Sequence, residues 1–233
     1  MSIENAGTEL FQNSRWDNER SDVLYAAQTM ADRKLVLGSS GNVSYRLQPA
    51  TRENLMAITP SGRAYSDLTS EDIVVIDFEG EPIIGDHIPS TESMAHAAIY
   101  LSRKDVGAVM HTHSPYASAV AVAGLAIPPI VDEMVIILGG GIEVTEYASP
   151  SSEDLAANIV TGLGNRKAVL VRNHGLVGVG KTPSEALYIC SMVEHLAQIF
   201  ISASKLGKIS TLPEEIVEVE KALYAMRLKA EYL

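Results

Sequence analysis

The residues best suited to chemistry in this chain are histidines that end apolar, strand-like runs. His111 and His113 end the run 107–113, and residues two apart on a strand project to the same face. His174 ends a second such run and is followed by Gly175. Three imidazole nitrogens can bind a first-row transition metal and leave a coordination position open. The pattern favours a metal site over the alternative that these histidines only cap a sheet.

A carboxylate near such a metal could act as a general base, and Glu92 is the candidate. It follows Ser90 and Thr91 at the start of a helix predicted over 92–101. On the residues alone, the simpler interpretation is that Glu92 complements the helix dipole. His96 lies one turn further along the same face, where we expect a structural role or a contact with Glu92.

Three short clusters of glycine and hydroxyl residues could hold an anion. They lie at 39–42, 59–62 and 90–91. Glycine allows close backbone approach, hydroxyl and amide groups donate hydrogen bonds, and a helix N-terminus favours negative charge. Each cluster taken alone is more often an ordinary turn or cap. No Lys- or Arg-rich cradle accompanies them, so a phosphate would be held mainly by neutral donors.

The elements that must position these residues follow from hydrophobic periodicity and turn residues. Helices are predicted over 16–37, 92–101, 115–124, 151–163, 183–206 and 214–229. Strands are predicted over 55–59, 73–78, 107–113, 168–172 and 176–179, and the segment 127–138 has β-branched character. Strands and helices intermingle without a GxGxxG or P-loop motif. The pattern predicts one compact α/β or α+β domain over 16–233 after a loose tail over 1–15.

Composition limits the partners and the compartment. The chain has 233 residues, 46% of them apolar, which is enough for a sizeable core. Its net charge of −11 makes a nucleic acid or an anionic membrane an unlikely partner. A single cysteine, Cys190, excludes an intramolecular disulfide framework and fits a reducing compartment. With neither a signal peptide nor an apolar stretch of roughly 20 residues, we expect a cytoplasmic protein.

Five motifs occur in order along the chain: Gly41-Asn42-Val43-Ser44, Thr59-Pro60-Ser61-Gly62, Pro89-Ser90-Thr91-Glu92, His111-Thr112-His113-Ser114-Pro115-Tyr116 and Arg172-Asn173-His174-Gly175-Leu176. In these motifs the sequence resembles the class II aldolase/adducin-like family, in particular the group of L-fuculose-phosphate aldolase and L-ribulose-5-phosphate 4-epimerase. The resemblance extends over residues 16–230.

The resemblance implies a role for each motif position. His111, His113 and His174 would bind Zn²⁺, with Mn²⁺ or Co²⁺ possible, and Glu92 would be the catalytic acid/base. Tyr224 lies in a segment like the one in which the aldolases keep a tail tyrosine, so it would either close over the site or be a buried helix aromatic. The implied phosphate-holding positions are Gly41, Asn42, Ser61, Gly62, Ser90 and Thr91.

The resemblance also implies an architecture and an assembly. The expected fold is a single three-layer α/β/α domain around a mainly antiparallel sheet. The expected assembly is a homotetramer with active sites at subunit interfaces. The chain departs from the fuculose-phosphate aldolases between Pro129 and Gly139, where they place a tyrosine that protonates the leaving aldehyde oxygen. Asp132 and Glu133 stand in that run instead, which leaves the natural aldehyde open.

The activity expected from these observations is zinc-dependent, reversible cleavage of a ketose 1-phosphate, such as L-fuculose 1-phosphate, to dihydroxyacetone phosphate and a small aldehyde. Two alternatives use the same enediolate chemistry, namely a pentulose-phosphate 4-epimerase and a metal-dependent decarboxylase. A third alternative, a non-catalytic adducin-like interaction domain, is disfavoured because such domains lack the metal-binding set that this chain retains.

Overall fold

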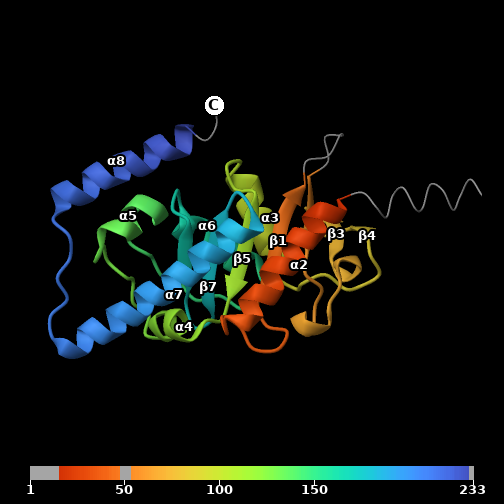
Figure 1. Cartoon of the computed structure of the whole chain (residues 1–233), viewed down its shortest axis with the longest axis horizontal. Coiled ribbons are helices and arrows are strands. Elements are labelled where there is room, and N and C mark those ends of the chain that lie inside the picture. Colours follow the sequence, from red (N-terminus) through yellow and green to blue (C-terminus); the bar gives the residue numbers. More distant parts are fainter. Residues whose placement is uncertain (1–15, 48–53, 231–233) are drawn as a thin grey trace, which may run out of the picture.

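A seven-stranded sheet forms the centre of the protein (Figure 1). The computed structural model describes residues 16–47 and 54–230, so the tail expected over 1–15 lies outside the described residues. The strand order is β4-β3-β2-β1-β5-β7-β6, and every neighbouring pair is antiparallel. The strands are β1 (Asn42–Leu47), β2 (Leu55–Ile58), β3 (Val74–Asp77), β4 (Pro82–Ile84), β5 (Ala108–Thr112), β6 (Ala168–Val171) and β7 (Gly175–Gly180).

Helices cover both faces of the sheet. In the described part of the chain they are α2 (Asp17–Asp32), α3 (Ser93–Ser102), α4 (Pro115–Val122), α5 (Asp132–Leu138), α6 (Glu153–Leu163), α7 (Pro183–Leu206) and α8 (Glu214–Ala230), with short 3₁₀ helices η1 (Tyr65–Asp67) and η2 (Ser70–Asp72). Helices α2, α4 and α7 share one apolar core with the sheet, and α3 and α6 share the other. The structure therefore confirms a mixed α/β fold with three layers around an antiparallel sheet.

The two cores explain why the strands read as continuous apolar runs. In β2, Leu55 and Ala57 belong to one core, while Met56 and Ile58 belong to the other. Successive side chains of a strand point to opposite faces, so a strand covered on both sides needs apolar residues at every position. All four residues of β2 are buried, as this arrangement requires.

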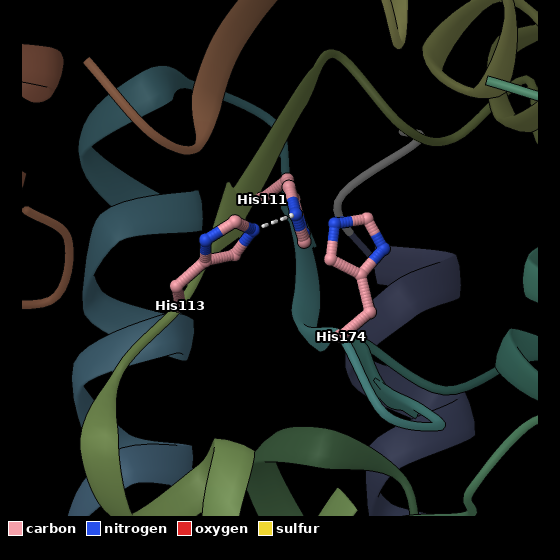
Figure 2. A group of neighbouring side chains, drawn as sticks. All are labelled: His111, His113 and His174. Atoms are coloured by element: carbon pink, nitrogen blue, oxygen red, sulfur yellow. Dashed lines mark hydrogen bonds between the residues drawn. The ribbon is translucent and has the colours of Figure 1, made fainter. Parts of the chain in front are cut away.

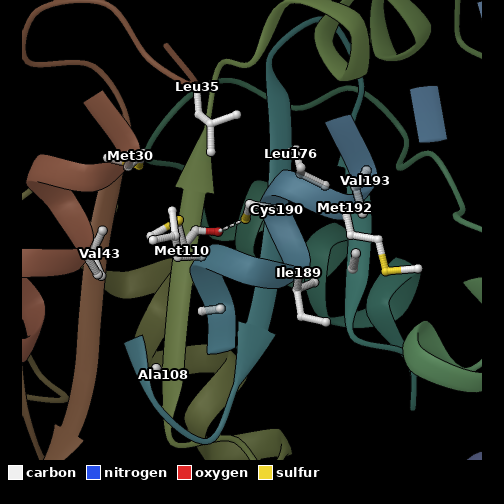
Figure 3. Close-up of a cluster of buried hydrophobic side chains, with 14 of the residues drawn as sticks. Met30, Leu35, Val43, Ala108, Met110, Leu176, Ile189, Cys190, Met192 and Val193 are labelled. Atoms are coloured by element: carbon white, nitrogen blue, oxygen red, sulfur yellow. Dashed lines mark hydrogen bonds between the residues drawn. The ribbon is translucent and has the colours of Figure 1, made fainter. Parts of the chain in front are cut away.

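Helix α7 is the main helix of the first core. Its residues Ile189, Cys190 and Val193 pack with Met110 of β5 and Leu176 of β7 (Figure 3). By length and composition alone α7 could cross a membrane, but its buried face belongs to this core, as in a soluble protein. Burial also raises the pKa of the Cys190 thiol, which fits the role of a small core residue.

Most of the elements predicted from the sequence are present, and the main difference lies in 127–138. Despite its β-branched character, this segment forms helix α5 from Asp132, and Ile127 makes only an isolated bridge to Ile142. The helix buries Met134, Val135 and Leu138, so packing decides the local structure over intrinsic preference. Strands β1 and β4 were not predicted, and β1 proves to be central to the site.

A close approach between β7 and α7 provides a test of this packing. A Cβ added at Gly178 would lie 2.6 Å from the Sγ of Cys190 and 3.2 Å from a side-chain carbon of Ile189. We therefore expect Gly178→Ala to lower the free energy of unfolding by about 1–3 kcal/mol, the usual effect of overpacking a core. In a Cys190→Ala background the same substitution should cost less, because the obstructing sulfur is gone. Urea denaturation of the four proteins measures both costs, and equal costs would contradict the packing.

Candidate active site

Three histidines meet at one end of the β5–β7 ladder (Figure 2). His111 is on β5, His113 follows its last residue, and His174 lies in the turn between β6 and β7. One ring nitrogen from each can be chosen so that all three lie within 4.8 Å of one another. The structure thus brings together histidines that are up to 63 positions apart in the sequence.

The strand pairing sets the direction of the His111 ring. Its Nδ1 lies 2.9 Å from the carbonyl oxygen of Leu176, so an Nδ1–H donates to the backbone and Nε2 carries the lone pair. That Nε2 lies 2.9 Å from the Nε2 of His113 (Figure 2). A hydrogen bond from Nδ1 to a backbone carbonyl, like the one to Leu176, is how proteins select the tautomer of a metal-binding histidine.

The turns around the histidines are equally constrained. A Cβ at Gly175 would lie 2.2 Å from the carbonyl oxygen of Thr112 and within 3.3 Å of the rings of His111 and His113, so only glycine fits there. On the other side, Glu194 of α7 accepts hydrogen bonds from the first backbone N–H groups of α4. Helix α4 begins two residues after His113, so this contact fixes the chain as it leaves the cluster.

Burial keeps two of the histidines in the form that binds metal. Loss of hydration lowers the pKa of both His111 and His113 below the ordinary value, so both rings are neutral at pH 7. Neutral imidazole is the ligating form. The three histidine nitrogens of the cluster match the donor set of a zinc-type site with one open position. The residues present therefore fit a divalent transition-metal ion.

Glu92 lies against the histidines from the start of α3. Its Oε2 is 3.4 Å from the Nε2 of His111, and its Oε1 is 3.4 Å from the Nε2 of His174. The side-chain amide of Asn42 donates a hydrogen bond to Oε2 at 3.0 Å. Burial alone would raise the pKa of Glu92, but His111, the Asn42 amide and the other histidines outweigh it, so the net shift is downward. The group is an ionised carboxylate at neutral pH.

A cleft of about 240 Å³ opens beside this carboxylate. All six positions expected to hold a phosphate line it, together with Glu92 and two of the histidines. The lining residues are Ser39, Ser40, Gly41, Asn42, Pro60, Ser61, Gly62, Ser90, Thr91, Glu92, His113, Pro150 and His174. Backbone hydrogen bonds from Ser61 to Ile88 and from Ser90 to Thr59 join the second and third clusters. Three separate turns thus become one concave surface rich in neutral donors.

Gly41 and Asn42 stand where this cleft meets the histidines. Gly41 has a φ of +73°, and a Cβ there would lie 2.6 Å from the carbonyl oxygen of His111. The buried hydroxyl of Tyr65 donates to the carbonyl oxygen of Gly41 at 2.6 Å and so holds the loop in place. No sequence motif pointed to Tyr65, because its contact depends on η1 folding back over the loop. The side chain of Asn42 is engaged with Glu92, so it orients the carboxylate.

Comparison with known proteins identifies the family. The model of the class II aldolase and adducin N-terminal domain matches residues 21–201. The chain belongs to the class II aldolase/adducin family. A 5-deoxy-D-ribulose 1-phosphate aldolase of Bacillus thuringiensis serovar kurstaki is 32% identical over 200 residues, which cover 86% of this chain and 92% of that protein. The L-fuculose phosphate aldolase of Escherichia coli K12 is 36% identical over 165 residues, or 71% and 74% of the two chains.

A solved structure supports the same assignment. An L-fuculose 1-phosphate aldolase superposes with a TM-score of 0.83 at 30% identity, over 89% of this chain and 96% of the other. The family, the fold and the enzyme class predicted from the motifs are thereby confirmed, and the protein is a class II aldolase. This family is metal-dependent, and the three-histidine group is where this aldolase can bind a metal.

The structure does not bring Tyr224 to the histidines of this aldolase. Tyr224 is on α8, where its side chain is 7% exposed and its hydroxyl donates to the carbonyl oxygen of Asn165 at 2.8 Å. The ring packs against Gly139, at the end of α5. Within its own chain Tyr224 is thus a buried helix aromatic.

The acids at the start of α5, Asp132 and Glu133, both contact side chains of their own chain. Asp132 lies beside Glu220 of α8, and the Oε1 of Glu133 is 3.5 Å from the hydroxyl of Tyr188 of α7. Neither acid lines the cleft described above.

Replacing one histidine tests the metal site. His113→Ala removes one of three nitrogens, and we expect metal affinity to fall by more than the roughly 10–100-fold that loss of an outer-shell partner causes. His195→Ala is the matched control, because His195 is exposed on α7 away from the cluster. Metal content after dialysis, measured by mass spectrometry, should fall in the first variant only. Full zinc occupancy in His113→Ala would show that the ligand set is wrong.

Proposed function

We propose that this class II aldolase uses Zn²⁺ to cleave a ketose 1-phosphate reversibly to dihydroxyacetone phosphate and a small aldehyde. The supporting observation is that Glu92 lies 3.4 Å from two of three clustered histidines, at the wall of a cleft lined by neutral hydrogen-bond donors. The names of the relatives support the same substrate class. They point to L-fuculose 1-phosphate, 5-deoxyribulose 1-phosphate and 5-methylthioribulose 1-phosphate as first candidates.

In this proposal the cleft binds the phosphate end of the substrate. The backbone and side-chain groups of six residues that line it would donate hydrogen bonds to the phosphate, namely Gly41, Asn42, Ser61, Gly62, Ser90 and Thr91. Ser61 and Thr91 are exposed in the free protein, so binding a phosphate there would not disrupt the core. Binding energy from this end would hold the reacting carbons against Glu92 and make the chemical step effectively intramolecular.

Glu92 would move the proton in the reaction. In cleavage the C3–C4 bond of the ketose breaks, the C4 hydroxyl loses its proton as the aldehyde forms, and C3 gains a proton. Glu92, which is ionised in the free enzyme, would pass a proton from the hydroxyl to C3. In condensation it would carry a proton in the opposite direction, from C3 of dihydroxyacetone phosphate. The amide of Asn42 donates to Oε2, so Oε1 would carry the transferred proton. His111, His113 and His174 would hold the zinc ion, which when bound supplies Lewis-acid polarisation of the substrate carbonyl.

We further propose that residues 16–233 form one cytoplasmic domain that assembles as a homotetramer with sites at subunit interfaces. Helix α8 supports an assembly, because its outer surface carries apolar side chains that the chain itself leaves 41–66% exposed. These are Ile216, Val219, Leu223 and Met226. The buried, free Cys190 fits a reducing compartment.

Release of dihydroxyacetone phosphate tests the reaction. The three candidate ketose 1-phosphates and one unphosphorylated ketose would be supplied to the purified enzyme, with product formation coupled to NADH oxidation. We expect release from at least one phosphate ester, abolished by a chelator and restored by Zn²⁺. The unphosphorylated ketose cannot yield dihydroxyacetone phosphate, so its cleavage is followed by the aldehyde product and should be much slower. No release from any ester while metal is bound would reject the aldolase reaction, and product analysis would then test for a 4-epimer or carbon dioxide.

A single substitution tests the role of Glu92. Glu92→Gln keeps the size of the side chain but removes its ability to accept a proton, so we expect kcat to fall by about 10²–10⁴-fold, the usual contribution of a general acid/base. Metal content should be unchanged, since the three histidines are intact. Glu153→Gln, at an exposed position in the first turn of α6, should behave as wild type. Near-normal kcat in Glu92→Gln would remove Glu92 from this role.

A further inference from the structure

A second buried histidine lies directly behind Glu92. His96 is on α3, four residues after Glu92, and its side chain is 1% exposed. Its Nδ1 lies 2.7 Å from the Oγ of Ser44, and that oxygen lies 2.8 Å from the hydroxyl of Tyr100. Ser44 and Asn42 are two apart on β1, so both point to the same face of the sheet. Tyr100, Ser44 and His96 thus form a buried polar chain that leads toward the carboxylate.

The other nitrogen of His96 has no hydrogen-bond partner among the described residues. It is buried, and an unpaired buried donor or acceptor costs free energy. A small void of about 10 Å³ lies next to the ring, and Glu92, His111 and His174 also line it. The rest of its wall is apolar, formed by Ala95, Ile99, Ile159, Val171 and Val177. This volume corresponds to about one water molecule, and the polar groups around it can provide the two to four partners such a water needs.

We propose that one water molecule occupies this void and joins the Nε2 of His96 to the carboxylate of Glu92, so that His96 is a positioning residue for the acid/base. This inference rests on the proposed function of Glu92. The carboxylate would then be held from two sides, by the amide of Asn42 and by the water. A carboxylate fixed in this way presents its remaining lone pairs in one direction only, which is what proton transfer at a single carbon requires.

The chain of hydroxyls defines the proton arrangement of His96. Tyr100 can donate to Ser44, and Ser44 then donates its single proton to Nδ1. The proton of the neutral ring therefore sits on Nε2, where it can be donated to the water beside Glu92. Burial lowers the pKa of His96 to about 4, so the ring is neutral at physiological pH. In this arrangement every member of the chain donates toward the carboxylate.

Two substitutions at one position separate positioning from packing. The side-chain amide of glutamine reaches about as far as Nε2, whereas that of asparagine reaches only as far as Nδ1. We expect His96→Asn to lower kcat about tenfold or more, as the loss of a hydrogen bond to an ionised group does. His96→Gln should recover most of that loss. The KM for the ketose phosphate and the bound metal should stay at wild-type values in both variants.

The proton-transfer step can be followed without the aldehyde. Exchange of the C3 hydrogen of dihydroxyacetone phosphate with deuterium from D₂O should fall in His96→Asn and recover in His96→Gln, in parallel with kcat. Equal losses in the two variants, or a change in KM or metal content instead of kcat, would overturn the proposal in favour of a packing role. If His96→Asn does not fold, Ser44→Ala is the second variant, because it removes the partner of Nδ1. It should lower kcat and the exchange rate, but by less than the tenfold expected for His96→Asn, and the metal should be retained.

A high-resolution crystal structure of the wild-type enzyme provides a readout that does not depend on activity. It should show one ordered water within hydrogen-bond distance of both the His96 Nε2 and the Glu92 carboxylate. A void without a water there would overturn the proposal. Wild-type enzyme that releases no dihydroxyacetone phosphate would overturn the proposed function instead, and the crystal structure would then decide the water by itself.

Discussion

The site depends on β5 being hydrogen-bonded on both of its edges. β1 pairs with β5 so that Asn42 is opposite His111, and β7 pairs with it so that Val177 is opposite the same residue. Because side chains alternate with a period of two, a slip by one residue would turn His111 to the other face and displace His113, which directly follows the strand. Apolar residues that fill the two cores would be displaced by the same slip, so the packing energy of the whole domain maintains the register of the site.

Burial and polar contacts then determine the protonation states of His111, His113 and Glu92. Loss of hydration favours neutral imidazole at His111 and His113, whereas neighbouring donors keep Glu92 ionised. A carboxylate beside neutral nitrogen ligands suits a site that binds a cation and moves one proton. The neutral hydroxyl and amide donors of the cleft suit an anionic group in the same way, since they can hydrogen-bond a phosphate without adding lysine or arginine next to the three histidines.

Much of this site could be predicted because it is encoded in short motifs at element ends. These motifs are a histidine pair at a strand end, a hydroxyl–acid pair at a helix start and glycines in turns. Their local geometry is set by neighbouring residues, so it can be predicted without knowing how the elements pack. Helix α5 and Tyr224 could not be predicted in this way. Helix α5 forms because Val135 and its neighbours fit the core, and the hydroxyl of Tyr224 finds its acceptor on the distant residue Asn165. Such contacts depend on which elements become neighbours.

The sequence by itself determined the set of residues available for chemistry, because residue types and local spacing carry that information. Its five motifs, through their resemblance to a known family, also implied the family and the three-layer fold. Only the tertiary structure decided how those residues meet. It directed the amide of Asn42 to Glu92, placed Tyr65 behind the loop of Gly41, and aligned His96 with Ser44 behind the carboxylate. These contacts join residues from 24 to 52 positions apart, and the hydrogen bonds between them form only after sheet register and helix packing have brought them together.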